Sequence, residues 1–265
     1  GATWTNLAFG SAMSTRRSFD GLNRLASITS VAATSTVYSA SYALNQANQR
    51  TTNVLADGSR WAFGYDEYGQ VVSSKKTFGD GIPVGGAQFE YTFDSIGNRI
   101  TAKPGGTNIS SYSANGLNQY SSRTVPDNYF VTGEASTGAV VLVGLTNSVM
   151  ALANRHGTYF WKAVTVTNSA NLVVATNLIR SRITSGTNSL VKTESRRTVV
   201  PKTPETFTHD LDGNMTADGL WTNTWDAENR VLTTESRSAV PDALKKKLLF
   251  TYDYKGRRTR KVSST

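Results

Sequence analysis

The sequence predicts an all-β protein made of antiparallel β-hairpins, and three observations point to that class. Strand-like segments with alternating apolar residues recur between turn residues, and Gly outnumbers Pro by 22 to 6. No segment sustains the apolar period of an amphipathic helix. At 265 residues the chain is long enough for one or two domains with a hydrophobic core.

A seven-residue phrase recurs along the chain: an aromatic or apolar residue, Asp or Asn, two variable residues, Gly or Asn, then Arg, Gln or Asn, then a strand residue. Its copies are Phe19–Leu25, Leu44–Arg50, Tyr65–Val71, Phe93–Arg99, Ala114–Tyr120, His209–Met215, Trp225–Val231 and Tyr252–Arg258. The second positions are Asp20, Asn45, Asp66, Asp94, Asn115, Asp210, Asp226 and Asp253. The fifth positions are Asn23, Asn48, Gly69, Gly97, Asn118, Gly213, Asn229 and Gly256.

This phrase has the chemistry of a turn. Asp or Asn at the first corner caps a turn with its own side chain, and Gly or Asn three residues later tolerates a positive φ. A type I turn followed by such a residue is a common hairpin connection. The second and fifth positions are therefore predicted to be structural turn residues, and each copy to be the turn of one hairpin.

The strands that flank the phrase carry aromatic residues at every second position, which places them on one face. The sets are Trp61 with Phe63 and Tyr65, Phe89 with Tyr91 and Phe93, Phe250 with Tyr252, and Trp221 with Trp225. One hairpin cannot bury such a face alone, so neighbouring repeats are expected to cover it.

The phrases YDEYGQV, FDSIGNRI, WDAENRV and YDYKGRR resemble the YD repeats of the RHS (rearrangement hot spot) family. That family includes bacterial polymorphic toxins, the cocoon subunits of insecticidal toxin complexes, and the teneurins. The resemblance covers roughly residues 15–120 and 207–260. It implies a curved, spiralling antiparallel sheet that closes, in full-length members, into a hollow shell around a cargo. It also implies a secreted or bacterial cell-surface protein whose partners are the rest of a larger RHS-like polypeptide or its cargo.

The repeat phrase is missing between residues 124 and 206. Prolines lie near both ends of this interval, Pro126 near its start and Pro201 and Pro204 near its end. Strand-like segments at 138–144, 159–167 and 172–179 with Gly and Asn turns predict a small β-sandwich, and residues 127–180 resemble small bacterial immunoglobulin-like modules. The alternative is that these strands are degenerate hairpins of the same sheet. We favour an insert at 124–206 between repeat regions at 1–123 and 207–265.

Composition narrows the function classes. The formal charge of +9 raises the possibility of nucleic-acid binding, but no nucleic-acid-binding motif accompanies it, and solvated basic strand faces explain the charge. The absence of cysteine excludes disulfides and thiol nucleophiles. No apolar run is long enough to span a membrane. The N-terminal segment lacks a signal-peptide layout and begins abruptly, so we expect the chain to be a fragment.

Candidates for chemistry are few. His156 and His209 are the only histidines and hence the weak candidates for catalysis. Asp210, Asp212 and Asn214 offer oxygen ligands at alternate positions, like the opening of a calcium loop, but Trp221 stands where an EF-hand needs Glu. Our first hypothesis is that the chain is a structural or interaction segment that serves enclosure or recognition. The alternatives are a calcium-dependent hydrolase of small esters or lactones on repeats closed into a barrel- or propeller-like body, and a carbohydrate-binding module.

Overall fold

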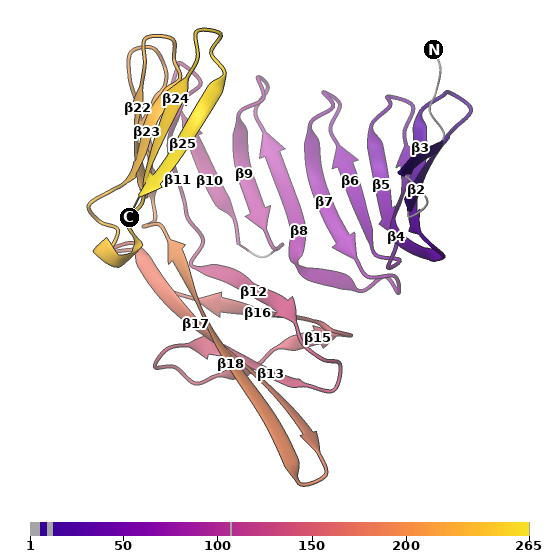
Figure 1. The fold of residues 1–265 in the computed structure, drawn as a ribbon. Helices are drawn as coiled ribbons and strands as arrows, with labels where there is room; N and C mark the ends of the chain where they lie inside the picture. Colours follow the sequence, from indigo (N-terminus) through magenta and orange to yellow (C-terminus); the bar gives the residue numbers. More distant parts are fainter. Residues whose placement is uncertain (1–5, 10–12, 107, 265) are drawn as a thin grey trace. The chain divides into compact units, whose positions relative to one another are not determined.

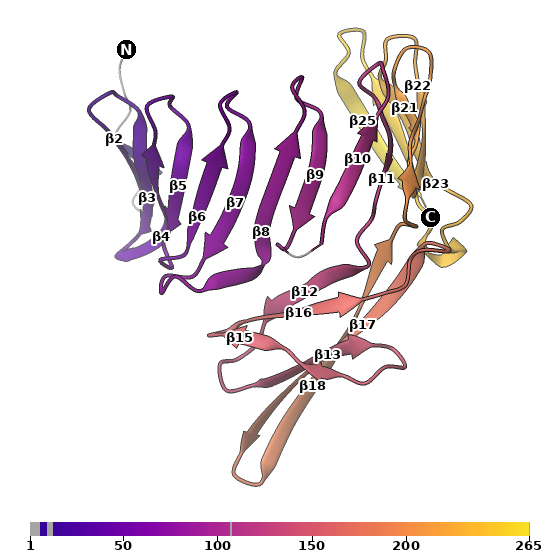
Figure 2. The ribbon, with the colours of Figure 1, turned by 180° about the vertical axis from the view of Figure 1, so that it is seen from behind.

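The structure is a computed structural model that describes residues 6–9, 13–106 and 108–264. Its strands pair antiparallel, which confirms the predicted all-β class (Figures 1 and 2). Within the described residues the one helical element is a short 3-10 turn, η1 (Asp242–Leu244). No helix in these ranges is long and apolar enough to cross a membrane.

The chain divides into two compact units, residues 1–92 with 102–107, and residues 93–101 with 108–265. The first unit consists of repeat hairpins. Its strands are β1 (Asn6–Phe9), β2 (Met13–Phe19), β3 (Leu25–Ala32), β4 (Ser35–Leu44), β5 (Arg50–Leu55), β6 (Arg60–Tyr65), β7 (Val71–Thr77) and β8 (Pro83–Phe93). Each pairs with the next in sequence order, so the hairpins follow one another as a meander.

The second unit holds further repeat strands on either side of a separate pair of sheets. The repeat strands are β10 (Ser110–Ala114), β11 (Tyr120–Arg123), β19 (Glu205–Thr206), β20 (Thr208–His209), β21 (Met215–Ala217), β22 (Trp221–Trp225), β23 (Val231–Ser236), β24 (Lys247–Tyr252) and β25 (Arg258–Ser264). Strand β9 (Arg99–Pro104) has residues in both units, and Phe93, the last residue of β8, belongs to the second unit.

The strands fall into four sheets. The largest has the order β1 to β11 followed by β19, and a six-stranded sheet runs from β20 to β25 in sequence order. Each of the four orders has two ends, so no sheet made by the described residues closes on itself. The alternative in which the repeats close into a barrel-like body is therefore not found.

Residues 128–200 form two sheets of their own. One has the order β12-β16-β15 and the other β14-β13-β17-β18. Their strands are β12 (Asn128–Glu134), β13 (Val140–Leu145), β14 (Ala151–Leu152), β15 (Asn154–His156), β16 (Tyr159–Thr165), β17 (Val173–Ser185) and β18 (Asn188–Val200). We call this pair of sheets the insert; the boundaries 124 and 206 stay a prediction.

The insert contains the larger buried core of the described residues. Val141, Val143 and Phe160 are at most 4% exposed and pack with Val131 and Val164 between the two sheets. Apolar residues at alternate positions of β13 and β16 supply this core, as the half-buried strand pattern requires. The long hairpin of β17 and β18 extends well beyond the strand expected at 172–179, and it turns at Gly186, where φ is +59°.

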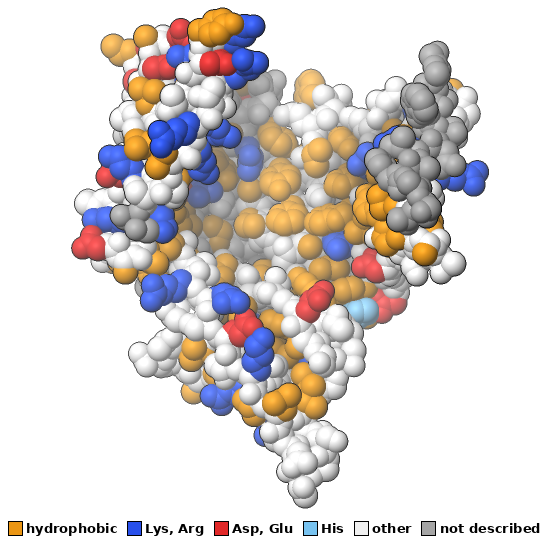
Figure 3. All heavy atoms as spheres, in the orientation of Figure 1, with side chains coloured by type: hydrophobic (Ala, Val, Ile, Leu, Met, Phe, Trp, Pro, Cys, Tyr) orange, Lys and Arg blue, Asp and Glu red, His pale blue; other side chains and the backbone are white. Residues whose placement is uncertain are grey.

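The repeat strands bury much less. Among the residues whose burial the structure describes, the buried apolar side chains of the repeats and their loops are small, namely Ala40, Val84, Ala102 and Val240. Trp61, Phe63 and Phe89 are only partly buried. Figure 3 shows hydrophobic side chains gathered in rows over strands β5 to β8. The described repeat strands thus have little buried core, and their backbone groups are paired in antiparallel ladders and at the turns.

Candidate functional site

The eight repeat turns share one hydrogen-bond pattern. In each, the second residue donates its backbone N–H to the sixth carbonyl, and the fifth residue donates its N–H to the second carbonyl. The fifth residue has a positive φ in all eight, between +58° and +91°. In the turn at Asp94, Oδ1 accepts the N–H groups of Ile96 and Asn98 at 3.1 and 2.8 Å. These bonds satisfy the backbone groups that the change of direction exposes.

A side-chain bond between the second and sixth residues closes each turn, and its direction depends on the residue pair. Where the second residue is Asp, the sixth donates: Asn98 Nδ2 lies 2.9 Å from Asp94 Oδ2. Where the second residue is Asn, the sixth is Gln and accepts, as when Asn45 Nδ2 donates to Gln49 Oε1 at 2.7 Å. The Asn115–Gln119 pair repeats this reversed bond at 2.8 Å. The two positions therefore complement each other as donor and acceptor.

The sixth residue also reaches the following turn. Where the fifth residue of that turn is Asn, its Oδ1 accepts a hydrogen bond from Arg24 (to Asn48, 3.0 Å), Asn98 (to Asn118, 3.3 Å) or Asn214 (to Asn229, 2.8 Å). Where the fifth residue is Gly69, Gly213 or Gly256, the side chain lies against the glycine instead. A Cβ built on Gly69 would stand 3.0 Å from Nε2 of Gln49. We call these contacts between successive turns the turn ladder.

A second set of cross-repeat bonds comes from the aromatic first position. Tyr65 Oη donates to the carbonyl of Arg50 at 2.7 Å, Trp225 Nε1 to that of Met215 at 3.0 Å, and Tyr252 Oη to that of Val231 at 2.9 Å. In every case the acceptor is the seventh residue of the preceding phrase. A buried or half-buried Tyr or Trp normally finds such a partner for its polar tip. The sequence predicts the aromatic face but not this bond, which depends on how neighbouring repeats align.

The turn ladder continues across the insert. A Cβ on Gly213 would lie 3.4 Å from Nε2 of Gln119, although these residues belong to phrases on opposite sides of the insert. Strand β11 pairs with β19 through Ser122↔Thr206 and Arg123↔Glu205. The insert therefore leaves and rejoins the repeat strands at adjacent points.

Glu205 is the buried charge at this junction, with a side chain only 3% exposed. Its Oε2 accepts from Arg123 Nε at 2.5 Å, and its Oε1 accepts the backbone N–H of Gly219 at 3.0 Å. A Cβ on Gly219 would be 2.6 Å from that same Oε1, so a glycine is needed for the close approach. One carboxylate thus joins β11, β19 and the turn between β21 and β22.

The turn geometry shifts the acidity of its aspartates. The Asn98 amide lowers the pKa of Asp94, and the backbone N–H of Arg24 lowers the pKa of Asp20. Arg230, through its guanidinium first, does the same to the pKa of Asp226. Burial raises the pKa of Asp210, but its hydrogen bonds from Asn214 and the turn backbone together outweigh burial and leave that pKa lowered. Each shift follows from hydrogen bonds donated to the ionised form.

The residues predicted as a calcium site lie in one of these eight turns. Asp210 Oδ1 accepts the N–H groups of Asp212 and Asn214, and Oδ2 accepts Asn214 Nδ2 at 3.1 Å. The Asp212 side chain is exposed. In the described ranges no three His, Asp or Glu residues cluster in a way that could hold a metal ion. The bonds around Asp210 are those of the turn at Asp94, so turn formation alone accounts for them.

The two histidines are not brought together. His156 lies in β15 of the insert, and His209 lies in β20, paired with Met215 in a different sheet. Neither lines the pocket of the insert described next.

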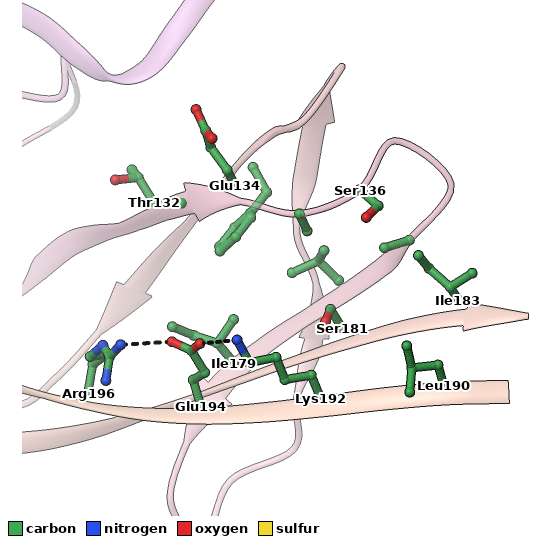
Figure 4. Close-up of a pocket in the computed structure, with 15 residues that line it drawn as sticks. Thr132, Glu134, Ser136, Ile179, Ser181, Ile183, Leu190, Lys192, Glu194 and Arg196 are labelled. Atoms are coloured by element: carbon green, nitrogen blue, oxygen red, sulfur yellow. Dashed lines mark hydrogen bonds and ion pairs between the residues drawn. The ribbon is translucent and has the colours of Figure 1, made fainter.

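That pocket lies between β12 and the β17–β18 hairpin and has a volume of about 440 Å³ (Figure 4). Its apolar part includes Val141, Phe160 and Ile179. Along β18, Lys192 and Arg196 flank Glu194, and each cation lies 2.9 Å from one of its carboxylate oxygens. The sequence offers no motif for this pocket, because the residues that line it come from five strands and the β12–β13 loop.

No protein-family model and no curated protein sequence matches the chain. Among solved structures it is similar to the crystal structures of TcdB2-TccC3-TEV and TcdB2-TccC3, at 13% and 12% identity and TM-scores of 0.41 and 0.40. It is also similar to the Tc holotoxin pore of Photorhabdus luminescens with a TccC3 mutation, at 13% identity and a TM-score of 0.40. These matches cover 95–96% of this chain but 12–13% of those chains.

Proposed function

We propose that this chain is a structural and interaction segment of an RHS-like repeat protein of the bacterial surface or secreted toxin type. The observation that carries the proposal is the turn ladder, whose contacts link successive turns with the same internal bonds and continue past the insert from Gln119 to Gly213. Contacts made only between neighbours give a repeat array stability that adds along its length. Such an array suits a wall that encloses or recognises a partner.

The half-buried aromatic rows support the same role. Trp61, Phe63 and Phe89 lie on one face of the first unit, and few large side chains of the repeats are fully buried. Apolar rows of this kind are covered when another part of a larger polypeptide, or a cargo, packs against them. We therefore expect the partners to be the rest of a larger RHS-like protein or the polypeptide it encloses.

An assay for metal and turnover separates this proposal from a calcium-dependent hydrolase. The thermal unfolding midpoint is measured with excess EDTA and again with calcium, next to hydrolysis of p-nitrophenyl acetate and of a γ-lactone. The scaffold predicts one midpoint in both conditions and no turnover above buffer. The matched pair Asp210→Asn and Asp94→Asn serves as control, because both aspartates are paired with an Asn side chain at the sixth position of the turn. Turnover with calcium that Asp210→Asn alone abolishes would overturn the proposal in favour of the hydrolase.

Carbohydrate binding is a second candidate, and one observation favours it. The rings of Trp61 and Phe63 are 14° from parallel with centroids 6.3 Å apart, and those of Trp61 and Phe89 are 19° from parallel at 6.4 Å. Such a row of near-parallel, partly buried rings offers apolar aromatic surface to the face of a pyranose ring. Calorimetric titration with soluble oligosaccharides tests it: Trp61→Ala should abolish binding heat, whereas Tyr68→Ala, at an exposed turn position, should keep it.

A further inference from the structure

One of the two sheets of the insert has one strand more than the other. The sheet β12-β16-β15 has three strands and faces the four-stranded sheet β14-β13-β17-β18, in which β18 is at the edge. Among the described residues β12 pairs with β16 alone, so it is an edge strand, and the pocket lined by both β12 and β18 puts these two edges on the same side. The pocket lies in the space beside β12 and opposite β18. It thus occupies the position that a fourth strand of the smaller sheet would take.

The free edge of β12 has a definite set of backbone groups. The N–H of Val166 donates to Asp127 and that of Ala135 to Thr158, which fixes the bonded pairs of the β12–β16 ladder at odd-numbered residues of β12. Because bonded and non-bonded pairs alternate in an antiparallel ladder, the N–H and C=O groups of Thr132 and Glu134 point toward the free edge. These are donors and acceptors ready for an added strand.

The wall opposite this edge combines apolar and charged side chains. Ile179 and Ile183 of β17, with Leu190 of β18, give an apolar part, and the ring of Phe160 lies over Gly133, where a Cβ would be 2.8 Å from Cζ (Figure 4). Further along β18, Lys192 and Arg196 are 73% and 69% exposed and share the single carboxylate of Glu194. In Figure 4 the Glu134 side chain points away from β18. The β18 wall therefore carries one uncompensated positive charge.

We propose that this groove binds an extended peptide as an added antiparallel strand on β12. The peptide carries an acidic side chain toward Lys192 and Arg196 and apolar side chains at alternate positions on either side of it. Backbone bonds to the edge supply affinity, and the side chains facing the groove supply selectivity. The groove lies wholly within the insert, so its occupancy is independent of the role proposed for the repeats.

The groove sets the length of the peptide. Leu190, Lys192, Glu194 and Arg196 face it at every second residue of β18, which corresponds to about 20 Å at roughly 3.3 Å per residue. A strand that follows this wall needs about seven residues at the same rise. The probe is acetyl-Thr-Val-Thr-Glu-Thr-Val-Thr-amide with a fluorescent label, whose binding to the full chain is measured by anisotropy. Its Val and Glu side chains face the groove and its Thr side chains face solvent.

Two modified peptides test the mode of binding. In an antiparallel pairing the Thr residues lie opposite Thr132 and Glu134 and exchange backbone bonds with them. N-methylation of the inner Thr amides should therefore abolish binding, whereas N-methylation of the Val and Glu amides, which face away from β12, should preserve it. Equal binding of both peptides would overturn strand addition. A peptide with Lys in place of Glu should bind at least about tenfold more weakly, about 1.4 kcal/mol.

Two double variants of the protein test the site. Lys192→Glu with Arg196→Glu should weaken the acidic peptide at least tenfold and improve binding of the Lys peptide. Arg180→Glu with Arg182→Glu makes the same change of net charge on the opposite face of the same hairpin, where both arginines are exposed, and should leave binding unchanged. Equal loss in both variants would point to non-specific attraction and overturn the proposal.

Two further outcomes also count against it. Inward-pointing charges on an edge strand can prevent another chain from adding a strand to the sheet. If neither the Glu peptide nor the Lys peptide binds, Lys192 and Arg196 have that protective role instead. Light scattering of the free chain, with and without peptide, detects a second copy on the same edge. A dimer that the peptide does not dissociate, in a chain that shows no peptide binding, would identify another copy as the occupant.

Discussion

The carboxylate of Glu205 should stabilise the junction between the insert and the repeats. Glu205→Ala removes the acceptor of two hydrogen bonds and leaves the guanidinium of Arg123, only a third exposed, without its ion-pair partner. Removing one partner of a buried ion pair lowers the free energy of unfolding by more than an exposed ion pair contributes to it. The partial exposure of Arg123 reduces this decrease. We expect a decrease of about 3 kcal/mol in the free energy of unfolding. That corresponds to a fall of roughly 6–12 °C in the unfolding midpoint for a chain of this size.

The neighbouring glycine gives this prediction its sharpest form. Gly219→Ala places a methyl group where Oε1 of Glu205 lies 2.6 Å away, so it should cost about 1–3 kcal/mol in the natural chain. In the Glu205→Ala background the clashing atoms are absent, and the same substitution should be close to neutral. Urea unfolding of the four chains, followed by tryptophan fluorescence, measures the coupling in a double-mutant cycle. Additive effects of the two substitutions would refute the contact and the reasoning built on it.

Three further predictions concern the repeats. Gly97→Val forces a β-branched residue to a φ of +91° and should cost roughly 1–3 kcal/mol by urea unfolding, and unchanged stability would contradict the assigned turn. Tyr65→Phe removes the bond to the preceding repeat and should cost about 1 kcal/mol, whereas Tyr68→Phe, at an exposed turn position, should cost nothing measurable. The lowered pKa of the turn aspartates means that their contribution is complete above their ordinary value of 3.8 and is lost as pH falls through the folded-state pKa. Below about pH 4 the thermal unfolding midpoint should therefore decrease as the pH is lowered. The decrease should be less steep in Asp226→Asn than in the natural chain, and equal pH profiles of the two chains would contradict this link.

The all-β antiparallel class was predictable because its signals are local. Turn chemistry and alternating aromatic residues lie within a few neighbouring positions, as in the phrase at Tyr65–Val71. The long hairpin of β17 and β18 also has a local signal, since Gly186 with Asn188 marks a turn between two strand-like segments, but it lies outside the repeat phrase and was missed. No local signal in the sequence shows that β18 is an edge strand that faces the free edge of β12 across the pocket.

The contacts between repeats could not be predicted, because they depend on register. Tyr65 reaches the carbonyl of Arg50, and Glu205 reaches Gly219, only once the strands have stacked in one particular alignment. The donor and acceptor exchange between Asn45 and Gln49 is visible in the sequence as a paired change, yet its meaning needs the side-chain geometry. The peptide groove depends on long-range placement in the same way, since it takes residues from both sheets of the insert.

The pairing of β11 with β19 also bears on how such a chain can change over evolution. Arg123 and Glu205 are opposite one another, so the intervening module begins and ends within one strand spacing of the repeats. A gene segment that encodes any domain with adjacent termini could be exchanged there without altering the contacts of Gln119 with Gly213. Recombination at this place could change the module that the protein carries while the repeats on both sides keep their sequence and their stacking.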